Sequence, residues 1–175
     1  ILSGILTNAT KQTTLKFAYE NLFSPLGIDV YEDVVFHTKE EQLSIMKDFH
    51  KSGWVADPQG VNTAGWGLFM TPSDMVKIGQ LLLNRGTWNG RQIVSPAWID
   101  ESTKVQSLWE DRNLSYGYLW WILDSDSCAA IGDGGNVIYV NHTNRLVVAI
   151  AASFKPVVRD RIKLIKDYIE PLLEN

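Results

Sequence analysis

The sequence is poor in cysteine, in long hydrophobic runs and in clustered positive charge. Its single cysteine, Cys128, cannot form an internal disulfide, so the fold must be stable without one. The formal net charge is −4 and no run of lysine or arginine occurs, which removes the electrostatic basis for binding nucleic acid. No apolar run reaches the roughly 20 residues that cross a bilayer, so no transmembrane segment is predicted.

Histidine is also scarce, and its spacing does not favour a metal site. His37, His50 and His142 are the three histidines, and none lies three or four residues from another, as a helical pair of ligands requires. The acids Asp126 and Asp133 near Cys128 would raise the pKa of its thiol, so an inert thiol is predicted. We predict neither a metal nor another cofactor.

What is present favours a globular fold with a substantial core. The 175 residues fall within the usual length of one domain, and 45% of them are hydrophobic, with seven tryptophans. Aromatic side chains can line an apolar acyl or peptide pocket, although large aromatics at alternating strand positions more often pack in a core. We assign one or two of the following to a pocket rim: Trp66, Tyr116, Tyr118, Trp120 and Trp121.

The most informative segment is 129–152, because the glycine-rich Asp133-Gly134-Gly135 interrupts two runs that favour strands. Glycine has no side chain, so a ligand can approach the main chain closely where glycines lie in a strand. Glycines inside a strand pattern also commonly mark a bulge or a bend of the sheet. The residues alone leave both interpretations open.

Apolar periodicity and capping residues predict helices at several places. Residues 1–9 and 13–23 form two of them, with Phe17, Leu22 and Phe23 as core residues. The strongest signal is Thr71-Pro72-Ser73-Asp74, which supplies an N-cap, a proline at the first helical position and an acid in the first turn. This helix should end at 84–86, where Gly86 can close it.

Two further helices follow. Ser95-Pro96 predicts a short one by the same capping logic. Segment 156–173 predicts a C-terminal helix that docks on a sheet with mixed charge on its outer face. Its apolar stripe consists of Val158, Ile162, Ile165, Ile169 and Leu172.

The strand signals lie between these helices. Asn89-Gly90 is a strong signal for a two-residue hairpin. Runs 120–123, 137–140 and 146–152 favour strands separated by short polar turns, which indicates an antiparallel meander. The last run is apolar at nearly every position, so we expect it to be buried on both faces. The predicted fold class is α+β, with an antiparallel sheet flanked by helices.

A set of ordered segments carries a family resemblance. Five segments precede the glycine-rich segment 129–152: 1–6, 14–28, 62–83, 86–98 and 116–121. Read in that order, they resemble the C-terminal half of the penicillin-binding, serine β-lactamase-like hydrolases, which include class C β-lactamases, D-alanyl-D-alanine carboxypeptidases, esterases and amidases. The resemblance implies that 1–175 is the C-terminal part of one β-lactamase/transpeptidase-like domain, with 28–60 as an insertion or irregular connection.

The same resemblance assigns the site residues. In that family a Ser-x-x-Lys box supplies nucleophile and base, a Tyr-x-Asn box comes second and a Lys-Thr-Gly-like strand closes the site. Only the third has a counterpart here: Asp133, Gly134 and Gly135 take its place as substrate-binding residues, with Asn136 following on the same strand. Asp133 departs from the family pattern, because a carboxylate repels the substrate carboxylate that a lysine or histidine would attract. Typical β-lactam recognition is therefore not expected.

The other two boxes are expected upstream of Ile1, so the chain would hold no catalytic residue and would be inactive alone. Two short matches are interpreted as coincidences. Ser44 and Lys47 match Ser-x-x-Lys within a charge-rich helical stretch whose buried stripe is Leu43, Met46 and Phe49. Lys51-Ser52-Gly53 matches a Lys-Ser-Gly box. A general acid/base pair among Asp124, Asp126 and Asp133 is also disfavoured, because their proximity in sequence is better explained by a solvated turn.

The sequence leaves three functions open, of which the last is a self-contained scaffold or interaction domain. In the first, the parent protein is a serine hydrolase that forms an acyl-enzyme with an ester, amide or peptide, from a small-molecule or peptide substrate. In the second, it is a non-catalytic binding or sensor relative of the same fold, which the departure at Asp133 favours. A lone C-terminal half would leave a sheet edge and apolar surface uncovered, so self-association is expected. The compartment and the natural substrate stay open.

Overall fold

The computed structural model describes residues 1–45, 51–152 and 159–173, with Arg112 described by its backbone alone. The chain divides into two compact units, Ile1–Thr71 and Pro72–Asn175. Within the described ranges, no helix has the length and apolar character needed to cross a membrane.

The first unit begins with the two helices predicted at 1–9 and 13–23. Their segments are α1 (Leu2–Thr10), α2 (Thr14–Ala18), the π-helical turn Tyr19–Phe23 and α3 (Ser24–Leu26). Thr13 caps α2 by accepting a hydrogen bond from the backbone N–H of Lys16 at 3.1 Å. Of the predicted core residues, Phe23 is buried, whereas Phe17 and Leu22 are half-buried.

Regular elements occur inside the region predicted as an insertion or irregular connection. They are β1 (Asp33–Val34), α4 (Lys39–Ile45) and β2 (Gly53–Val55), and β2 also pairs with β3 (Leu68–Phe69). The buried Asn62 connects this sheet to α2. Its Oδ1 accepts a hydrogen bond from the Leu15 N–H at 2.8 Å, and its Nδ2 donates to Asp33 at 2.7 Å.

The second unit begins with the most strongly predicted helix, and its start at Pro72 is confirmed. α5 (Pro72–Leu83) ends as expected, where the Gly86 N–H donates to the Leu81 carbonyl at 2.8 Å. The predicted hairpin joins β4 (Thr87–Trp88) to β5 (Arg91–Gln92), and α6 (Pro96–Ser102) follows. Ser95 caps α6 by accepting a hydrogen bond from the Trp98 N–H at 3.2 Å.

The main sheet is the predicted antiparallel meander, with strand order β11-β10-β9-β8-β7-β6. Its strands are β6 (Ser107–Trp109), β7 (Leu114–Tyr116), β8 (Trp121–Ile122), β9 (Ser127–Gly132), β10 (Asn136–Asn141) and β11 (Leu146–Ile150). The α+β class is confirmed. β11 is half-buried at every residue, not fully buried as predicted, because it is an edge strand of the described sheet.

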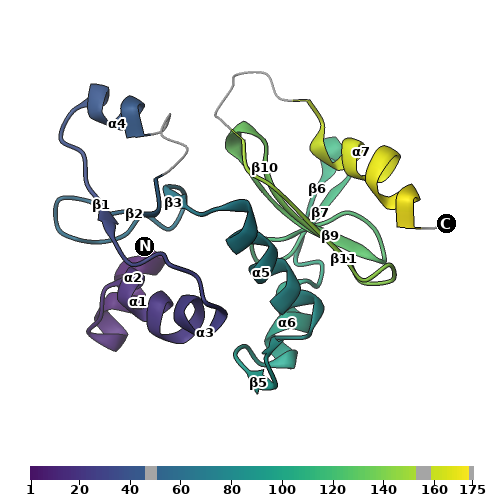
Figure 1. Cartoon of the computed structure of the whole chain (residues 1–175), viewed down its shortest axis with the longest axis horizontal. Helices are drawn as coiled ribbons and strands as arrows, with labels where there is room; N and C mark the ends of the chain where they lie inside the picture. The colour runs from purple at the N-terminus through teal and green to yellow at the C-terminus, as the bar shows by residue number, and fades with distance from the viewer. Residues whose placement is uncertain (46–50, 153–158, 174–175) are drawn as a thin grey trace. The chain divides into compact units, whose positions relative to one another are not determined.

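Helices cover both faces of this sheet (Figure 1). α5 and α6 pack against the face that carries Cys128 and Val140. Gly79 permits the close approach of α5, since a Cβ there would lie 2.5 Å from Cγ1 of Val147. The opposite face, with Ala129 and Tyr139, packs against the C-terminal helical segment.

The C-terminal segment consists of α7 (Arg161–Leu164), a π-helical turn (Ile165–Ile169) and a 3₁₀ turn (Glu170–Leu173). Its docking is confirmed, because Ile165 is buried and Ile162 and Ile169 pack beside it. Leu172 is 72% exposed, so its place in the stripe was wrong; the π and 3₁₀ turns alter the 3.6-residue period on which the stripe depended. The predicted start at Pro156 and Val158 lies outside the described residues.

Polar contacts also connect this segment to the sheet. Oε1 of Glu170 accepts hydrogen bonds from the Tyr139 hydroxyl at 2.6 Å and from Nδ2 of Asn141 at 2.7 Å. Burial and the bond to Glu170 raise the pKa of Tyr139 to about 12. Lys166 forms an ion pair with Asp124, in the turn between β8 and β9.

Candidate functional site

Asp133-Gly134-Gly135 forms the tight turn between β9 and β10. Gly134 has φ 79° and Gly135 has φ 95°, in the left-handed region that favours glycine. The prediction that these residues continue a strand into Asn136, and the alternative of a bulge within one strand, are both wrong. The glycines instead reverse the chain in a hairpin, and Asn136 is the first residue of β10.

Exposure at this turn decreases from its first residue to its last. Asp133 is exposed, Gly134 is half-buried and Gly135 is buried. A ligand at the turn would therefore meet the Asp133 side chain and the main chain near Gly134. Gly135 serves the reversal of the chain.

Asn136 holds the turn by using both ends of its carboxamide. Its Nδ2 donates a hydrogen bond to the carbonyl of Asp133 at 3.1 Å, and its Oδ1 accepts one from the N–H of Ala152 at 2.9 Å. These bonds connect the turn to the chain that leaves β11. The side chain thus has a structural role that the sequence assignment of Asn136 to substrate binding did not include.

The aspartates predicted as a disfavoured acid/base pair lie at different ends of β9. Asp124 and Asp126 precede the strand and Asp133 follows it, so about 20 Å of extended chain separates them. Burial alone would raise the pKa of Asp124, but hydrogen bonds from Lys166, Ser127 and the backbone N–H of Asp126 lower that pKa to about 2. The structure therefore does not bring these acids together.

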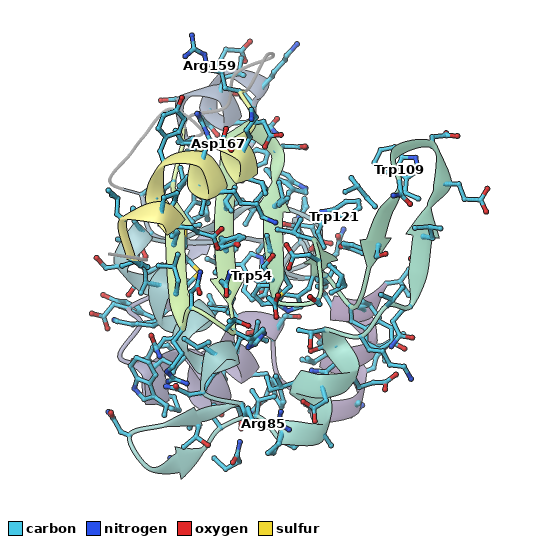
Figure 2. All side chains as sticks on the ribbon, turned by 90° about the vertical axis from the view of Figure 1, so that its right-hand side faces the viewer. Trp54, Arg85, Trp109, Trp121, Arg159 and Asp167 are labelled. Atoms are coloured by element: carbon cyan, nitrogen blue, oxygen red, sulfur yellow. The ribbon has the colours of Figure 1, made fainter. Side chains whose placement is uncertain are left out.

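An aromatic group, formed by Trp109, Tyr116 and Trp121, lies on the sheet face that also carries Ala129. The register places Tyr116 opposite Trp121, and Trp121 opposite Ala129. The ring centroids of Tyr116 and Trp121 are 4.5 Å apart, and those of Trp109 and Trp121 are 6.1 Å apart. Figure 2 shows Trp109 on the projecting hairpin, with Trp121 between it and the rest of the sheet.

This aromatic group meets β9 where Trp121 pairs with Ala129. Ala129 precedes Asp133 by four residues, or about 13 Å of strand, and Ile131 on the same face between them is 43% exposed. The sheet face between Trp121 and the turn is therefore apolar, with Ala129 buried and Ile131 exposed. Such a face can hold an apolar acyl or peptide group.

Of the five aromatics predicted for a pocket rim, only Tyr116 and Trp121 join this group. Trp120 packs against the core beneath α5, Tyr118 stacks on Trp98 at 5.6 Å, and Trp66 lies in the first unit. Trp109 was missed. The signal that could have found it is the alternation of polar and apolar residues in 107–109 and 114–116, on either side of a polar turn.

The remaining candidates do not form a nucleophilic site. Ser44 lies on α4, and its predicted partner Lys47, with Met46 and Phe49, falls outside the described residues. The Ser52 hydroxyl donates to the carbonyl of Asp29 at 3.0 Å. Cys128 is buried, and burial together with Asp124 raises the pKa of its thiol to about 12, as the prediction of an inert thiol requires.

The fold is similar to solved structures of bacterial proteins. A Bacillus anthracis protein with the provisional name 6-aminohexanoate-dimer hydrolase matches with a TM-score of 0.73 and 19% identity, over 99% of this chain and 41% of that chain. A provisionally named β-lactamase from Bacteroides dorei DSM 17855 matches with a TM-score of 0.66 and 10% identity, over 99% of this chain and 55% of that chain. A penicillin-binding protein homolog from Caulobacter crescentus matches with a TM-score of 0.58 and 15% identity, over 87% and 50%.

These neighbours belong to the serine β-lactamase and penicillin-binding protein superfamily, and the chain has their fold. It spans about half of their length, from 41% to 55%. Comparison of the sequence with protein-family models and with curated proteins finds no match.

Proposed function

We propose that this chain forms the substrate-binding side of a serine hydrolase that makes an acyl-enzyme with an ester, amide or peptide. The observation that carries the proposal is the fold likeness, which extends over 99% of this chain. The nucleophilic serine and its base would come from sequence beyond this chain, in keeping with the 41% to 55% of the neighbours' length that it spans. The chain alone would then be inactive.

In this proposal the substrate extends along the sheet, with one part beside Gly134 and an apolar part against the aromatic group of Trp109, Tyr116 and Trp121. The main chain at Gly134 permits close approach, and the aromatic rings supply apolar contact. The exposed Asp133 carboxylate disfavours a substrate carboxylate at the same place and favours a neutral or cationic group.

Covalent labelling tests the proposed chemistry. The complete protein should react with a serine-directed fluorophosphonate at one serine and hydrolyse p-nitrophenyl esters, whereas the 175-residue chain should do neither. A complete protein that binds a ligand saturably yet resists labelling and hydrolyses no ester would support the alternative, a binding or sensor relative. Labelling of the isolated chain at any of its own serines would contradict the division of the site.

A charge substitution tests the role of Asp133. In the complete protein, Asp133→Asn should raise kcat/KM for an ester that carries a carboxylate by about fivefold, as one screened unit charge some 7 Å away predicts, and leave a neutral ester unchanged. Asp29→Asn, which removes an exposed charge in the first unit, is the matched control. Equal responses of the two esters to Asp133→Asn would remove this residue from the site.

We also propose that the isolated chain self-associates through β11. In the described sheet β11 pairs with β10 alone, and an edge strand presents unpaired main-chain groups. Sedimentation velocity should show dimers or larger species at high concentration. A compact monomer throughout the concentration series would contradict this proposal.

A further inference from the structure

An open cavity of about 390 Å³ lies in the second unit, where the end of α5, α6 and the β10–β11 turn meet. It is at the other end of β10 from the Asp133–Asn136 turn, and Figure 2 shows Arg85 at the end of the unit away from Asp167. Its volume is in the range of small-molecule sites. The lining residues are Leu83, Arg85, Ile99, Asp100, Thr103, His142 and Arg145.

The charges that line this cavity do not cancel. Arg85 Nη2 lies 2.7 Å from Asp100 Oδ2, so these two residues neutralise each other. Arg145 Nη2 instead donates to the neutral Oδ1 of Asn84 at 3.4 Å, and no carboxylate lies within ion-pair distance of Arg145 in the described part of the chain. With His142 neutral, the cavity carries one net positive charge.

His142 adds a charge that depends on pH. Partial burial and the neighbouring Arg85 lower its pKa, while Asp126 raises it. Arg145 and Asp100 also line the cavity that the imidazole borders. The positive charge of Arg145 acts to lower the pKa of His142, and the negative charge of Asp100 acts to raise it. The net effect is a pKa of His142 below its usual range, which favours the neutral imidazole.

The two arginines are also held in an unusual backbone conformation. Arg85 has φ 53° and Arg145 has φ 49°, in the left-handed region that non-glycine residues seldom adopt. Arg85 adopts it where the chain leaves α5, and Arg145 adopts it in the turn between β10 and β11. The floor beneath them is aliphatic, since Leu83 and Ile99 are both buried core residues.

We propose that this cavity binds a small aliphatic monocarboxylate. The carboxylate oxygens accept hydrogen bonds from the guanidinium groups of Arg145 and Arg85, and the alkyl chain lies over Leu83 and Ile99. One negative charge matches the one positive charge of the cavity. A phosphate dianion carries more charge than the cavity offsets, and Thr103 supplies it no hydrogen because its hydroxyl already donates to the Ile99 carbonyl at 2.8 Å.

Titration calorimetry of the full chain with butyrate, butyramide and inorganic phosphate tests the proposal at pH 7. Butyrate should bind in the millimolar range, more tightly than phosphate, and butyramide should not bind. Arg145→Gln should weaken butyrate binding by about fivefold or more, because it removes the charge without a carboxylate partner. Arg91→Gln, an exposed arginine in the β4–β5 hairpin, is the matched control and should change nothing.

A second measurement needs no variant. Butyrate should raise the pKa of His142, followed by the NMR shift of its ring protons, because a bound anion favours the imidazolium. Affinity should correspondingly increase as the pH falls through this pKa. Equal binding of butyramide, tighter binding of phosphate, unchanged affinity in Arg145→Gln or a His142 pKa that ignores butyrate would each overturn the proposal.

Discussion

Replacement of Asn136 by alanine should destabilise the second unit by loosening the turn that precedes β10. The substitution removes two hydrogen bonds, one to the Asp133 carbonyl and one from the Ala152 N–H. Each contributes about 1 kcal/mol, which gives a loss of about 2 kcal/mol in the free energy of unfolding. For a chain of this length, that corresponds to a fall in Tm of roughly 4–8 °C.

Urea unfolding followed by tryptophan fluorescence measures this loss as a lower midpoint with an unchanged slope. Hydrogen exchange localises it, because the Ala152 amide should exchange faster in Asn136→Ala. Asn144→Ala, an exposed asparagine in the β10–β11 turn, is the control. If Asn136→Ala and Asn144→Ala unfold at the same urea concentration, the two hydrogen bonds do not hold the turn and the structural role of Asn136 is refuted.

Three further outcomes follow from polar contacts of the second unit. Glu170→Ala should lower the free energy of unfolding by about 2–4 kcal/mol, because it leaves the buried Tyr139 hydroxyl and the Asn141 side-chain amide without their hydrogen-bond acceptor. Chemical denaturation of Glu170→Ala beside Glu170→Gln measures this loss. Since the pKa of Asp124 is lowered to about 2, its pairing with Lys166 stabilises the fold above about pH 4, and this stabilisation is lost as the pH falls toward 2. The fall in the free energy of unfolding between pH 4 and pH 2 should therefore be smaller in Asp124→Asn than in the unmodified chain. The same fall in both proteins would contradict this prediction. Cys128, with its thiol pKa raised to about 12, should react with a thiol reagent only in denaturant, and rapid reaction of the native chain would show that the site is open.

The elements that the sequence predicted well are those with signals confined to a few neighbouring residues. The Ser95 cap places a side-chain oxygen near the N–H groups of its own helix, and Asn89-Gly90 adopts left-handed conformations that most residues avoid. Gly86 closes α5 for the same reason. Such preferences act without help from distant parts of the chain, so the boundaries of these elements follow from local chemistry.

The candidate site was predicted less well, because its geometry depends on register between strands. Asp133-Gly134-Gly135 is compatible with a strand, a bulge or a hairpin, and pairing of Gly132 with Asn136 across the turn decides among them. Trp109 gains its place beside Trp121 through the pairing of β6, β7 and β8. Both arrangements depend on how neighbouring strands pair, which neither segment determines alone.

The structure also redistributes the roles within the predicted set of site residues. Nδ2 and Oδ1 of Asn136 each bond to a main-chain partner and Gly135 is buried, so these two residues hold the turn. Charge selection at the turn would therefore depend on Asp133, and apolar recognition on the aromatic group that begins about 13 Å away along β9. A substrate that uses both would extend along the sheet, with its apolar part over Trp121 and a neutral or cationic part at the turn.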